Sequence, residues 1–274
     1  MNSLKFSVLM SIYINDKLIN VQDCIDSLVN QTLLPNEIII VLDGPVKIEI
    51  ENYLISYQKN SCIQIVIERL DENKGLPTAL NKGLQKCRYN LIARMDADDI
   101  CSLDRFEKQI ARFEMNPSLT LLGGSLEEFY ADNTLSQIKY AVMENITQYS
   151  KLRSPFNHPT VVFKKQDIIG VGGYDEELYY AQDYELWCRL IQLNFEVGNI
   201  EDVILKFRMA DNFLTKRSGL KYIKIEWSLF QKLSKIGHLK GLEKIRFLII
   251  RCLPRVLPTI VLKQVYGLLR SFRL

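Results

Sequence analysis

Over the first hundred residues, short apolar runs alternate with segments in which apolar residues recur every three or four positions. The runs Phe6–Tyr13 and Glu37–Leu42 show no helical stripe and are typical of buried strands. Residues 18–31, between them, have apolar side chains spaced for one face of a helix. The same patterns predict further strands over 63–68 and 90–95 and further helices over 46–58 and 78–87.

Strands that alternate with helices are usually parallel and joined by right-handed crossovers. The pattern therefore predicts an α/β fold with a mostly parallel sheet flanked by helices. In such open sheets, ligands bind beyond the carboxyl ends of the strands. Asp43 follows the second strand and the run Asp96–Asp99 follows the fourth, so these acidic residues are the first candidate functional positions.

Beyond residue 100 the pattern is less regular. Residues 105–113 and 183–193 are expected to form helices, the second with Trp187 directed toward the core. Gly170–Gly173 is expected to be a flexible turn. Further strands are expected over 119–124, 134–142 and 203–209, and segment 157–163 is expected to contain His158-Pro159-Thr160 followed by a strand.

Charge divides the chain in two. The net charge of the 274 residues is only +3, but residues 211–274 contain fourteen Lys and Arg against three Asp and Glu, a net +11, and residues 1–210 carry a net −8. We therefore expect a domain over 1–210 and a basic amphipathic helical extension over 211–274. The first apolar stripe of that extension consists of Leu220, Ile223, Trp227, Phe230 and Leu233.

Composition excludes several classes of protein. With 47% apolar and 24% charged residues, the chain is neither collagen-like nor of low complexity. Its six cysteines form no CxxC pair or zinc-type spacing, which favours buried thiols in a reducing, cytosolic setting. The first residues read as a strand rather than a secretion signal, and no run of about eighteen apolar residues predicts a membrane span.

The run Asp96-Ala97-Asp98-Asp99 is the strongest chemical signal. Three carboxylates within four residues repel one another unless a cation neutralises them. Mg²⁺ and Mn²⁺ prefer oxygen ligands and commonly combine one or two carboxylates with substrate phosphates. A solvated turn is the alternative, because Asp is common in turns.

Several segments follow a recognisable order over about the first 200 residues: FSVLMSIY, DSLVNQT, EIIIVLDGP, Gly75-Leu76 with Ala79-Leu80-Asn81, ARMDADDI, GGYDE and QDYELW. Together they resemble the family 2 glycosyltransferases, which have the GT-A fold, a Rossmann-like sheet flanked by helices. The segments VLDGP and RMDADDI are most similar to those of bacterial enzymes, including the amylovoran type, that build exopolysaccharide, capsule or O-antigen repeats.

The resemblance implies roles for the acidic residues at the strand ends. Asp43 would contact the uracil of the donor, unless it serves only the turn before Gly44. Asp98 would bind the metal ion that bridges the diphosphate, and Asp96 would contact the ribose or the hydration water of the metal. Asp99 would support them or cap the next helix. Arg94 would contact the diphosphate or form an ion pair with these acids.

The resemblance also implies a general base. Asp183 matches the acid of the family's Glu-Asp motif, although this chain has Gln182 where Glu is usual; the alternative role is an N-cap of the following helix. His158 would assist the donor phosphates or be a structural loop histidine. Residues 172–176 resemble the acceptor-side loop, and Trp187 is expected in the core rather than as a sugar platform. The QxxRW motif of processive synthases is not found, which favours one sugar per encounter.

The expected activity is inverting, metal-dependent transfer of one sugar from a UDP-sugar to a lipid-linked glycan, with Mn²⁺ or Mg²⁺ as cofactor. The expected location is cytoplasmic, at the inner face of the cell membrane.

Residues 211–274 would lie on anionic lipid, pack as an ordinary helical subdomain, or bind nucleic acid; no nucleic-acid motif supports the last. The rivals are a nucleotidyltransferase, although no Gly-rich basic loop follows the first strand, and a binding module without catalysis, against which Asp96, Asp98 and Asp183 argue.

Overall fold

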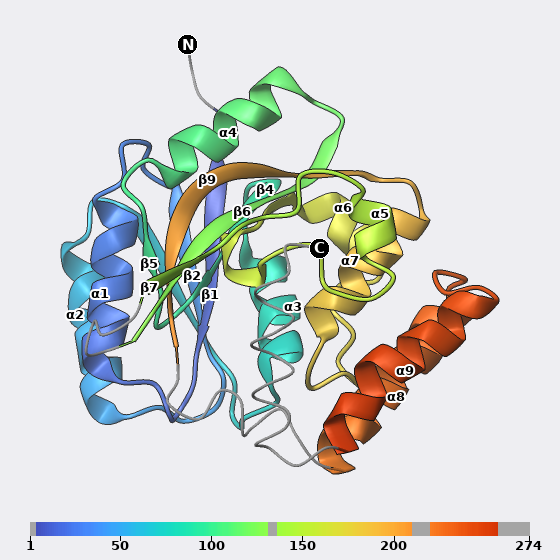
Figure 1. Ribbon diagram of the computed structural model, residues 1–274. Coiled ribbons are helices and arrows are strands. Elements are labelled where there is room, and N and C mark those ends of the chain that lie inside the picture. Colours follow the sequence, from blue (N-terminus) through green and yellow to red (C-terminus); the bar gives the residue numbers. More distant parts are fainter. Residues whose placement is uncertain (1–3, 131–135, 210–219, 257–274) are drawn as a thin grey trace.

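The computed structural model describes residues 4–130, 136–209 and 220–256 (Figure 1). The remaining parts of the basic extension, over 211–219 and 257–274, lie outside the described residues. In chain order the elements are β1 (Phe6–Ile12), α1 (Leu18–Val29), β2 (Glu37–Leu42), α2 (Ile48–Asn60), β3 (Gln64–Arg69), α3 (Leu76–Lys86), β4 (Leu91–Asp96), β5 (Ile100–Cys101), α4 (Arg105–Met115), β6 (Leu119–Phe129), β7 (Ser136–Lys139), α5 (Ile146–Tyr149), a 3₁₀ turn (His158–Thr160), β8 (Val162–Lys164), α6 (Lys165–Gly170), α7 (Gln182–Gln192), β9 (Glu196–Arg208), α8 (Leu220–Lys235) and α9 (Leu242–Val256).

The strands form one mixed sheet in the order β3-β2-β1-β4-β8-β6-β9-β5, with β7 paired to β6. The first four strands along this order are parallel, as the alternating pattern predicts, and β8 joins β4 in antiparallel register. Ser11 pairs with Asp96, and Ile12 pairs with Leu42. The carboxyl ends of β1, β2 and β4 therefore meet at one edge of the sheet, and the acidic residues that follow β2 and β4 meet there with them.

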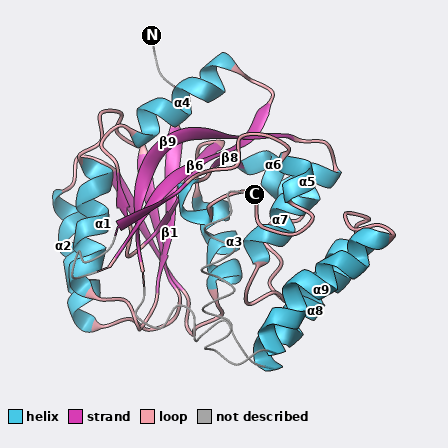
Figure 2. Cartoon of the chain, in the orientation of Figure 1, coloured by secondary structure: helices cyan, strands magenta, loops and turns pink. Residues whose placement is uncertain are grey.

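Helices cover both faces of the sheet (Figure 2). Alternate residues of each buried strand point to opposite faces, so Val8 belongs to one apolar core and Leu9 to the other. The first core includes residues of α1, α2 and α4, and the second includes residues of α3, α6 and α7. Trp187 is fully buried in the second core, and its ring packs edge-on against Phe156, which confirms its expected core position.

The structure extends some expected elements and adds others. The strand expected over 203–209 begins at Glu196, because β9 pairs along nearly the whole of β6 despite the polar residues in its first half. The strand expected over 134–142 is described only as Ser136–Lys139. The helices α5 and α6 have four and six residues, too few for a periodic apolar pattern to announce them.

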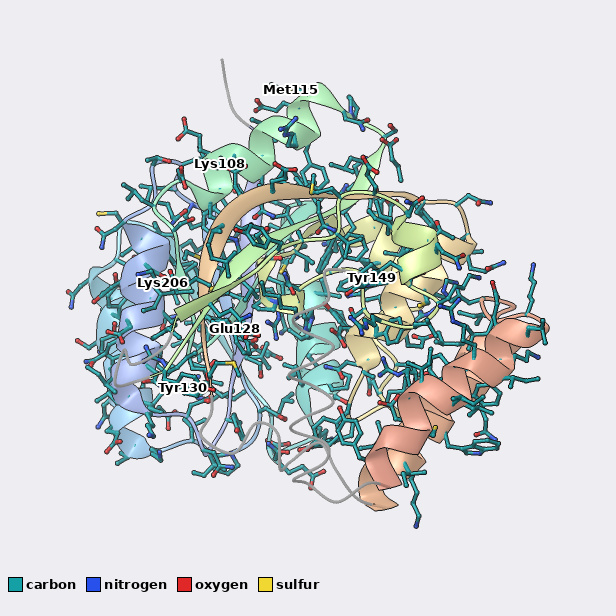
Figure 3. All side chains as sticks on the ribbon, viewed as in Figure 1. Lys108, Met115, Glu128, Tyr130, Tyr149 and Lys206 are labelled. Atoms are coloured by element: carbon teal, nitrogen blue, oxygen red, sulfur yellow. The ribbon has the colours of Figure 1, made fainter. Side chains whose placement is uncertain are left out.

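In Figure 1, α8 and α9 lie side by side beyond α7, at the side of the molecule farthest from α1 and α2. They share an apolar cluster with α7, and Tyr149 of α5 lies nearby (Figure 3). The predicted stripe of α8 is partly wrong, because Leu229 and Leu233 face this cluster and Trp227 is 49% exposed. The buried members of the cluster are Tyr184, Cys188, Leu229, Leu233, Leu239 and Phe247.

A buried ion pair joins the two helices of this hairpin. Arg251 of α9 donates from Nε and Nη2 to the Glu226 carboxylate of α8, at 2.6 and 3.0 Å. Its Nη1 donates to the carbonyl of Leu152, and its guanidinium lies over the Tyr184 ring. One side chain therefore holds α8, α9 and α7 together.

The domain division at residue 210 stays a prediction. None of the helices in the described ranges combines the length and apolar character needed to cross a membrane.

Candidate active site

The acidic run begins at the last residue of β4. Two residues earlier in the strand, Arg94 forms an ion pair with the Asp96 carboxylate. Arg94 is only 2% exposed, and its Nε and Nη1 atoms have no hydrogen-bond partner within the described residues. The ion pair that the sequence offered as one of two roles is therefore present. The two unpartnered nitrogen atoms still leave Arg94 able to donate to an anionic ligand.

Asp98 and Asp99 follow in a turn that leads to β5. Asp98 is half-buried, and burial, followed by the neighbouring Asp96, raises its pKa to about 6. Asp99 is fully buried, and its pKa is raised well above the ordinary value by burial, then by Asp96 and Asp98. Its Oδ1 accepts the backbone N–H of Arg208 at 2.9 Å, and the residue at the N-cap of α4 is Asp104. The expected capping role of Asp99 is therefore wrong, because its carboxylate binds the end of β9.

Arg208 is a site residue that sequence reasoning missed. Its Nε donates to the carbonyl of Asp98 at 2.9 Å, and its Nη2 pairs with Asp23 of α1 at 3.0 Å. Its guanidinium lies 4.8 Å from the centre of the Phe129 ring. This arginine thus fixes the backbone that carries Asp98 and Asp99. No local motif marks it, since the residues that it joins lie far away in the sequence.

The acidic turn offers oxygen ligands of the kind that a hard divalent cation takes. Burial is the largest cause of the raised pKa of Asp98, and repulsion from the Asp96 carboxylate adds to it. A bound cation would offset this repulsion. Within the described ranges, no group of three His, Cys, Asp or Glu side chains forms a ready metal cage. The arrangement fits a cation that is held by one or two carboxylates and completed by phosphate and water.

Asp43 lies at the carboxyl end of β2 and is 4% exposed. Its two carboxylate oxygens accept the backbone N–H groups of Lys74 and Gly75, at 2.7 and 3.0 Å. The side chain therefore fixes the turn before α3, a role that the sequence analysis did not assign to it. Each oxygen keeps a second lone pair, so the contact with uracil stays a prediction.

Asp16, in the loop after β1, is a second residue that the sequence analysis missed. Its Oδ2 accepts the N–H of Tyr13 at 2.9 Å. Burial raises its pKa to about 7; the Tyr13 N–H acts against this rise, and Asp98 and Asp96 add to it. Asp16 therefore belongs to the same electrostatic cluster as the acidic turn.

Asp183 is the second residue of α7 and is half-buried. The N-cap position belongs to Ala181, which has a left-handed φ of 60°, so the capping role considered for Asp183 is wrong. The first turn of a helix still favours a negative charge there. After burial and Arg94, both Asp183 and Asp96 act on the pKa of Tyr174. The structure therefore brings Asp183 and the acidic turn to the same tyrosine.

His158 lies beside these residues. Its Nε2 is 3.0 Å from the Tyr174 hydroxyl, and its ring lies against the rings of Tyr174 and Trp187. Burial and then Arg94 lower the pKa of His158 well below its ordinary value. A neutral imidazole brings no positive charge to donor phosphates, so any help it gives them is a hydrogen bond. Its contacts support the structural role.

The loop over 172–176 is held firmly, contrary to the expected flexible turn. Asn81 of α3 accepts the N–H of Tyr174 at 2.9 Å and donates to its carbonyl at 2.8 Å. Arg189 of α7 donates to the carbonyls of Val171 and Gly173. Gly173 has a φ of +70°, and a Cβ there would lie 2.7 Å from the Asn81 Oδ1, so the position requires glycine for close approach.

The sequence matches the family model described as "Glycosyl transferase family 2" over residues 7–171. The chain belongs to this family, and its class is that of the glycosyltransferase enzymes. The matched segment contains Asp43, the acidic turn and His158, and it ends before Asp183.

Two relatives match along nearly their whole length. The chain is 38% identical over 266 residues to the amylovoran biosynthesis glycosyltransferase AmsE of Erwinia amylovora, which covers 95% of this chain and 97% of the relative. It is 35% identical over 257 residues to an Escherichia coli enzyme named UDP-Gal:alpha-D-GlcNAc-diphosphoundecaprenol beta-1,3-galactosyltransferase, covering 93% and 92%.

The solved structures of TarS from S. aureus share the fold. The complex of TarS residues 1–349 with UDP-GlcNAc matches with a TM-score of 0.68 at 15% identity, over 89% of this chain and 70% of that chain. The corresponding UDP complex gives a TM-score of 0.66. These similarities confirm the GT-A fold that the sequence predicts.

If the chain binds UDP with a metal ion as the family resemblance implies, Arg208→Gln is predicted to weaken that binding by about tenfold, because the variant loses the guanidinium contact that links the Asp98 carbonyl to Asp23 of α1. The UDP affinity of Arg208→Lys should lie between those of the native protein and Arg208→Gln, since an ammonium can replace one of the two contacts. Calorimetric titration with UDP in the presence of Mn²⁺ measures the effect.

The matched control is Lys206→Gln. Lys206 lies on the same strand (Figure 3), its side chain is 58% exposed, and its nearest carboxylate, Glu127, is 4.0 Å away. Unchanged UDP binding in Arg208→Gln, with a native melting temperature, would show that Arg208 does not position the acidic turn.

Asp16→Asn is predicted to raise the melting temperature of the metal-free protein by about 3 °C near pH 8. The pKa of Asp16 rises from 3.8 in the unfolded chain to about 7 in the fold. The folded state therefore binds more protons between these values, and the native protein loses stability as the pH rises through this range. The asparagine keeps the acceptor for Tyr13 without the charge.

The advantage of the variant should shrink as the pH falls from about 7 toward about 4, which thermal denaturation across this range measures. The exposed Asp71→Asn is the control and should show no such trend. Equal melting temperatures of Asp16→Asn and the native protein near pH 8 would contradict the assignment.

Proposed function

We propose that this glycosyltransferase moves a single sugar from a UDP-sugar to a lipid-linked glycan, with inversion at the anomeric carbon and with Mn²⁺ or Mg²⁺. The product would be a repeat of a bacterial surface polysaccharide, such as an O-antigen, a capsule or an exopolysaccharide. AmsE is named for amylovoran biosynthesis, and the E. coli relative is named for a UDP-Gal donor and a diphosphoundecaprenol acceptor. Both cover more than nine-tenths of the chain.

The observation that carries the proposal is that acidic groups from separate parts of the chain lie within electrostatic reach of one buried tyrosine. Asp96 and Asp98 come from the end of β4, and Asp183 comes from α7. Tyr174 lies within electrostatic reach of both Asp96 and Asp183. Inverting transfer needs an anion-binding side for the leaving diphosphate and a carboxylate for the attacking hydroxyl.

In the proposed reaction, Asp183 accepts the proton of the acceptor hydroxyl while its oxygen attacks the anomeric carbon. The bond from that carbon to the diphosphate oxygen breaks, and the electron pair leaves with UDP. Asp96 and Asp98 would hold the cation, which offsets the charge on the diphosphate when bound. Arg94 would donate from its two unpartnered nitrogens, Nε and Nη1, toward the same charge, and Asp43 would contact the uracil.

The alternatives are less well supported. A nucleotidyltransferase would also use acidic residues at strand ends, but the family match and the named relatives are glycosyltransferases. A binding module would not need a second carboxylate opposite the donor side, such as Asp183.

Asp98→Ala is predicted to abolish Mn²⁺-dependent binding of UDP, and Asp183→Asn is predicted to leave that binding within about twofold. Asp183→Asn should also reduce sugar transfer by at least about a hundredfold, because an amide cannot accept the proton. Calorimetric titration of UDP with and without Mn²⁺ checks the first effect, and turnover of UDP-sugars with a diphospholipid acceptor checks the second.

Asp71→Asn serves as the matched control for charge loss at an exposed site. Absence of UDP binding to the native protein with Mn²⁺ would overturn the donor assignment. Normal turnover in Asp183→Asn would remove that residue from the role of base.

The membrane part of the proposal rests on the outer face of α9. Leu242, Ile245 and Ile249 are more than half exposed and lie three and four residues apart, so they form one apolar stripe. Lys244 and Arg246 accompany them on the same helix. Exposed apolar residues beside basic ones suit the surface of an anionic bilayer, where a lipid-linked acceptor would be presented.

Arg246→Glu is predicted to weaken binding to vesicles that contain phosphatidylglycerol by about tenfold, because basic residues near an anionic surface contribute attraction that acidic residues reverse. Binding to purely zwitterionic vesicles should be weak for both proteins. Co-sedimentation measures the difference.

The control is Lys59→Glu at the end of α2, which should bind vesicles like the native protein. Equal loss in both variants, or no binding of the native protein to anionic vesicles, would contradict the membrane contact of α9.

A further inference from the structure

An exposed group of tyrosines borders the start of α7. Tyr179 is 61% exposed and Tyr180 is 44% exposed. The centres of their rings are 5.0 Å apart in an edge-to-face contact, and the Tyr180 ring lies 6.3 Å from that of Tyr222 on α8. We call Tyr179, Tyr180 and Tyr222 the tyrosine platform. Large exposed aromatic surfaces that touch one another are uncommon on a protein without a binding role.

The tyrosine platform reaches the donor side of the site at one end. A Cβ added to Gly75 would lie 3.2 Å from Cε2 of Tyr179, so this ring rests against the turn that Asp43 fixes. Tyr179 also lies within electrostatic reach of Tyr13, as does Asp98. The other end of the platform is formed by α8, so the rings extend from the donor site to the helical hairpin.

The segment that carries Tyr179 and Tyr180 is held from two sides. Lys232 of α8 forms ion pairs with Asp175 and, at 2.9 Å, with Glu177. Glu176 accepts hydrogen bonds from Thr78 and Asn81 of α3, both at 2.9 Å. Rings held in this way lose little freedom on binding, which lowers the entropic cost of a contact.

The chain turns sharply between the platform and the candidate base. Tyr180 precedes Ala181, whose left-handed φ is uncommon for a residue other than glycine, and Asp183 follows two residues later. Left-handed residues of this kind often occur at functional sites. The turn brings the exposed rings next to the first turn of α7. A ligand that approaches Asp183 from this side meets the platform.

We propose that the tyrosine platform binds the sugar ring of the glycan acceptor, with the apolar C–H face of a pyranose stacked on the rings of Tyr180 and Tyr222. The inference rests on the proposed function, because it needs Asp183 to act on an acceptor hydroxyl. Tyrosine suits this ligand, since its ring face is apolar and its hydroxyl bonds to sugar oxygens. Tyr222 belongs to α8, so the basic extension contributes to the acceptor site.

The test compares leucine and phenylalanine at two positions of the platform. The probe is N-acetylglucosamine α-linked through a diphosphate to a short alkyl chain, titrated calorimetrically into protein that already holds UDP and Mn²⁺. Tyr180→Leu and Tyr222→Leu should each weaken binding of this probe by about tenfold. Tyr180→Phe and Tyr222→Phe keep the ring face and should stay within about threefold of the native protein.

The matched control is Tyr57→Leu on α2, because Tyr57 also pairs with a neighbouring tyrosine, Tyr53, and α2 lies on the opposite side of the molecule (Figure 1). All variants should bind UDP with Mn²⁺ like the native protein, which separates this proposal from the donor assignment. If UDP binds but the leucine variants bind the probe as the native protein does, or the native protein does not bind it, the platform proposal is overturned. If UDP does not bind, the proposed function fails first.

Discussion

Repulsion among like charges at the carboxyl end of β4 is the constraint on which the site depends. Three carboxylates lie within four residues, and the pKa values of Asp98 and Asp99 are raised, first by burial and then by the neighbouring carboxylates. The fold tolerates this with two arginines of different kinds. Arg94, a buried residue of β4, forms an ion pair with Asp96, and Arg208 of β9 donates a hydrogen bond to the Asp98 carbonyl. Neither arginine neutralises the charge of Asp98 fully. A cation bound at the turn would offset the remaining negative charge and could carry a diphosphate with it.

The two halves of the site are built by different means. The half that contains Asp43 and the acidic turn follows from the parallel register of β1, β2 and β4, which would bring strand ends together in any sequence of this pattern. The half around Tyr174 depends on single contacts: Asn81 fixes the backbone of Tyr174, and Arg189 fixes the glycine turn before it. The boundary between the two halves falls where the sheet changes direction, since β8 pairs with β4 in antiparallel register and ends the set of parallel strands.

The amino-acid pattern was sufficient for the first half of the fold and for the acidic residues, because both depend on local periodicity and on strand ends. It located β1 to β4 and α1 to α3 within a few residues, and it placed Trp187 in the core. It failed where the cause is not local. Arg208 contacts residues more than a hundred positions away, and the raised pKa of Asp16 arises from burial in the fold, with smaller contributions from Asp98 and Asp96. The exposed position of Trp227 depends on which face of α8 meets α7, and the left-handed Ala181 depends on the packing that surrounds it.

The distance along the chain between Asp98 and Arg208 has a consequence for the order of events during synthesis. The bond from Arg208 to the Asp98 carbonyl joins residues 110 positions apart, and within the described part of the chain β5 pairs with β9 alone. A chain that grows from its N-terminus completes the parallel strands before β9 exists, but the contacts of Arg208 with Asp98 and Asp99 form only after residue 208 has emerged. Contacts between such distant residues form slowly. A nascent chain therefore has a nearly finished parallel sheet while the backbone of Asp98 and Asp99 still lacks its contacts with β9, and these contacts form in a late step.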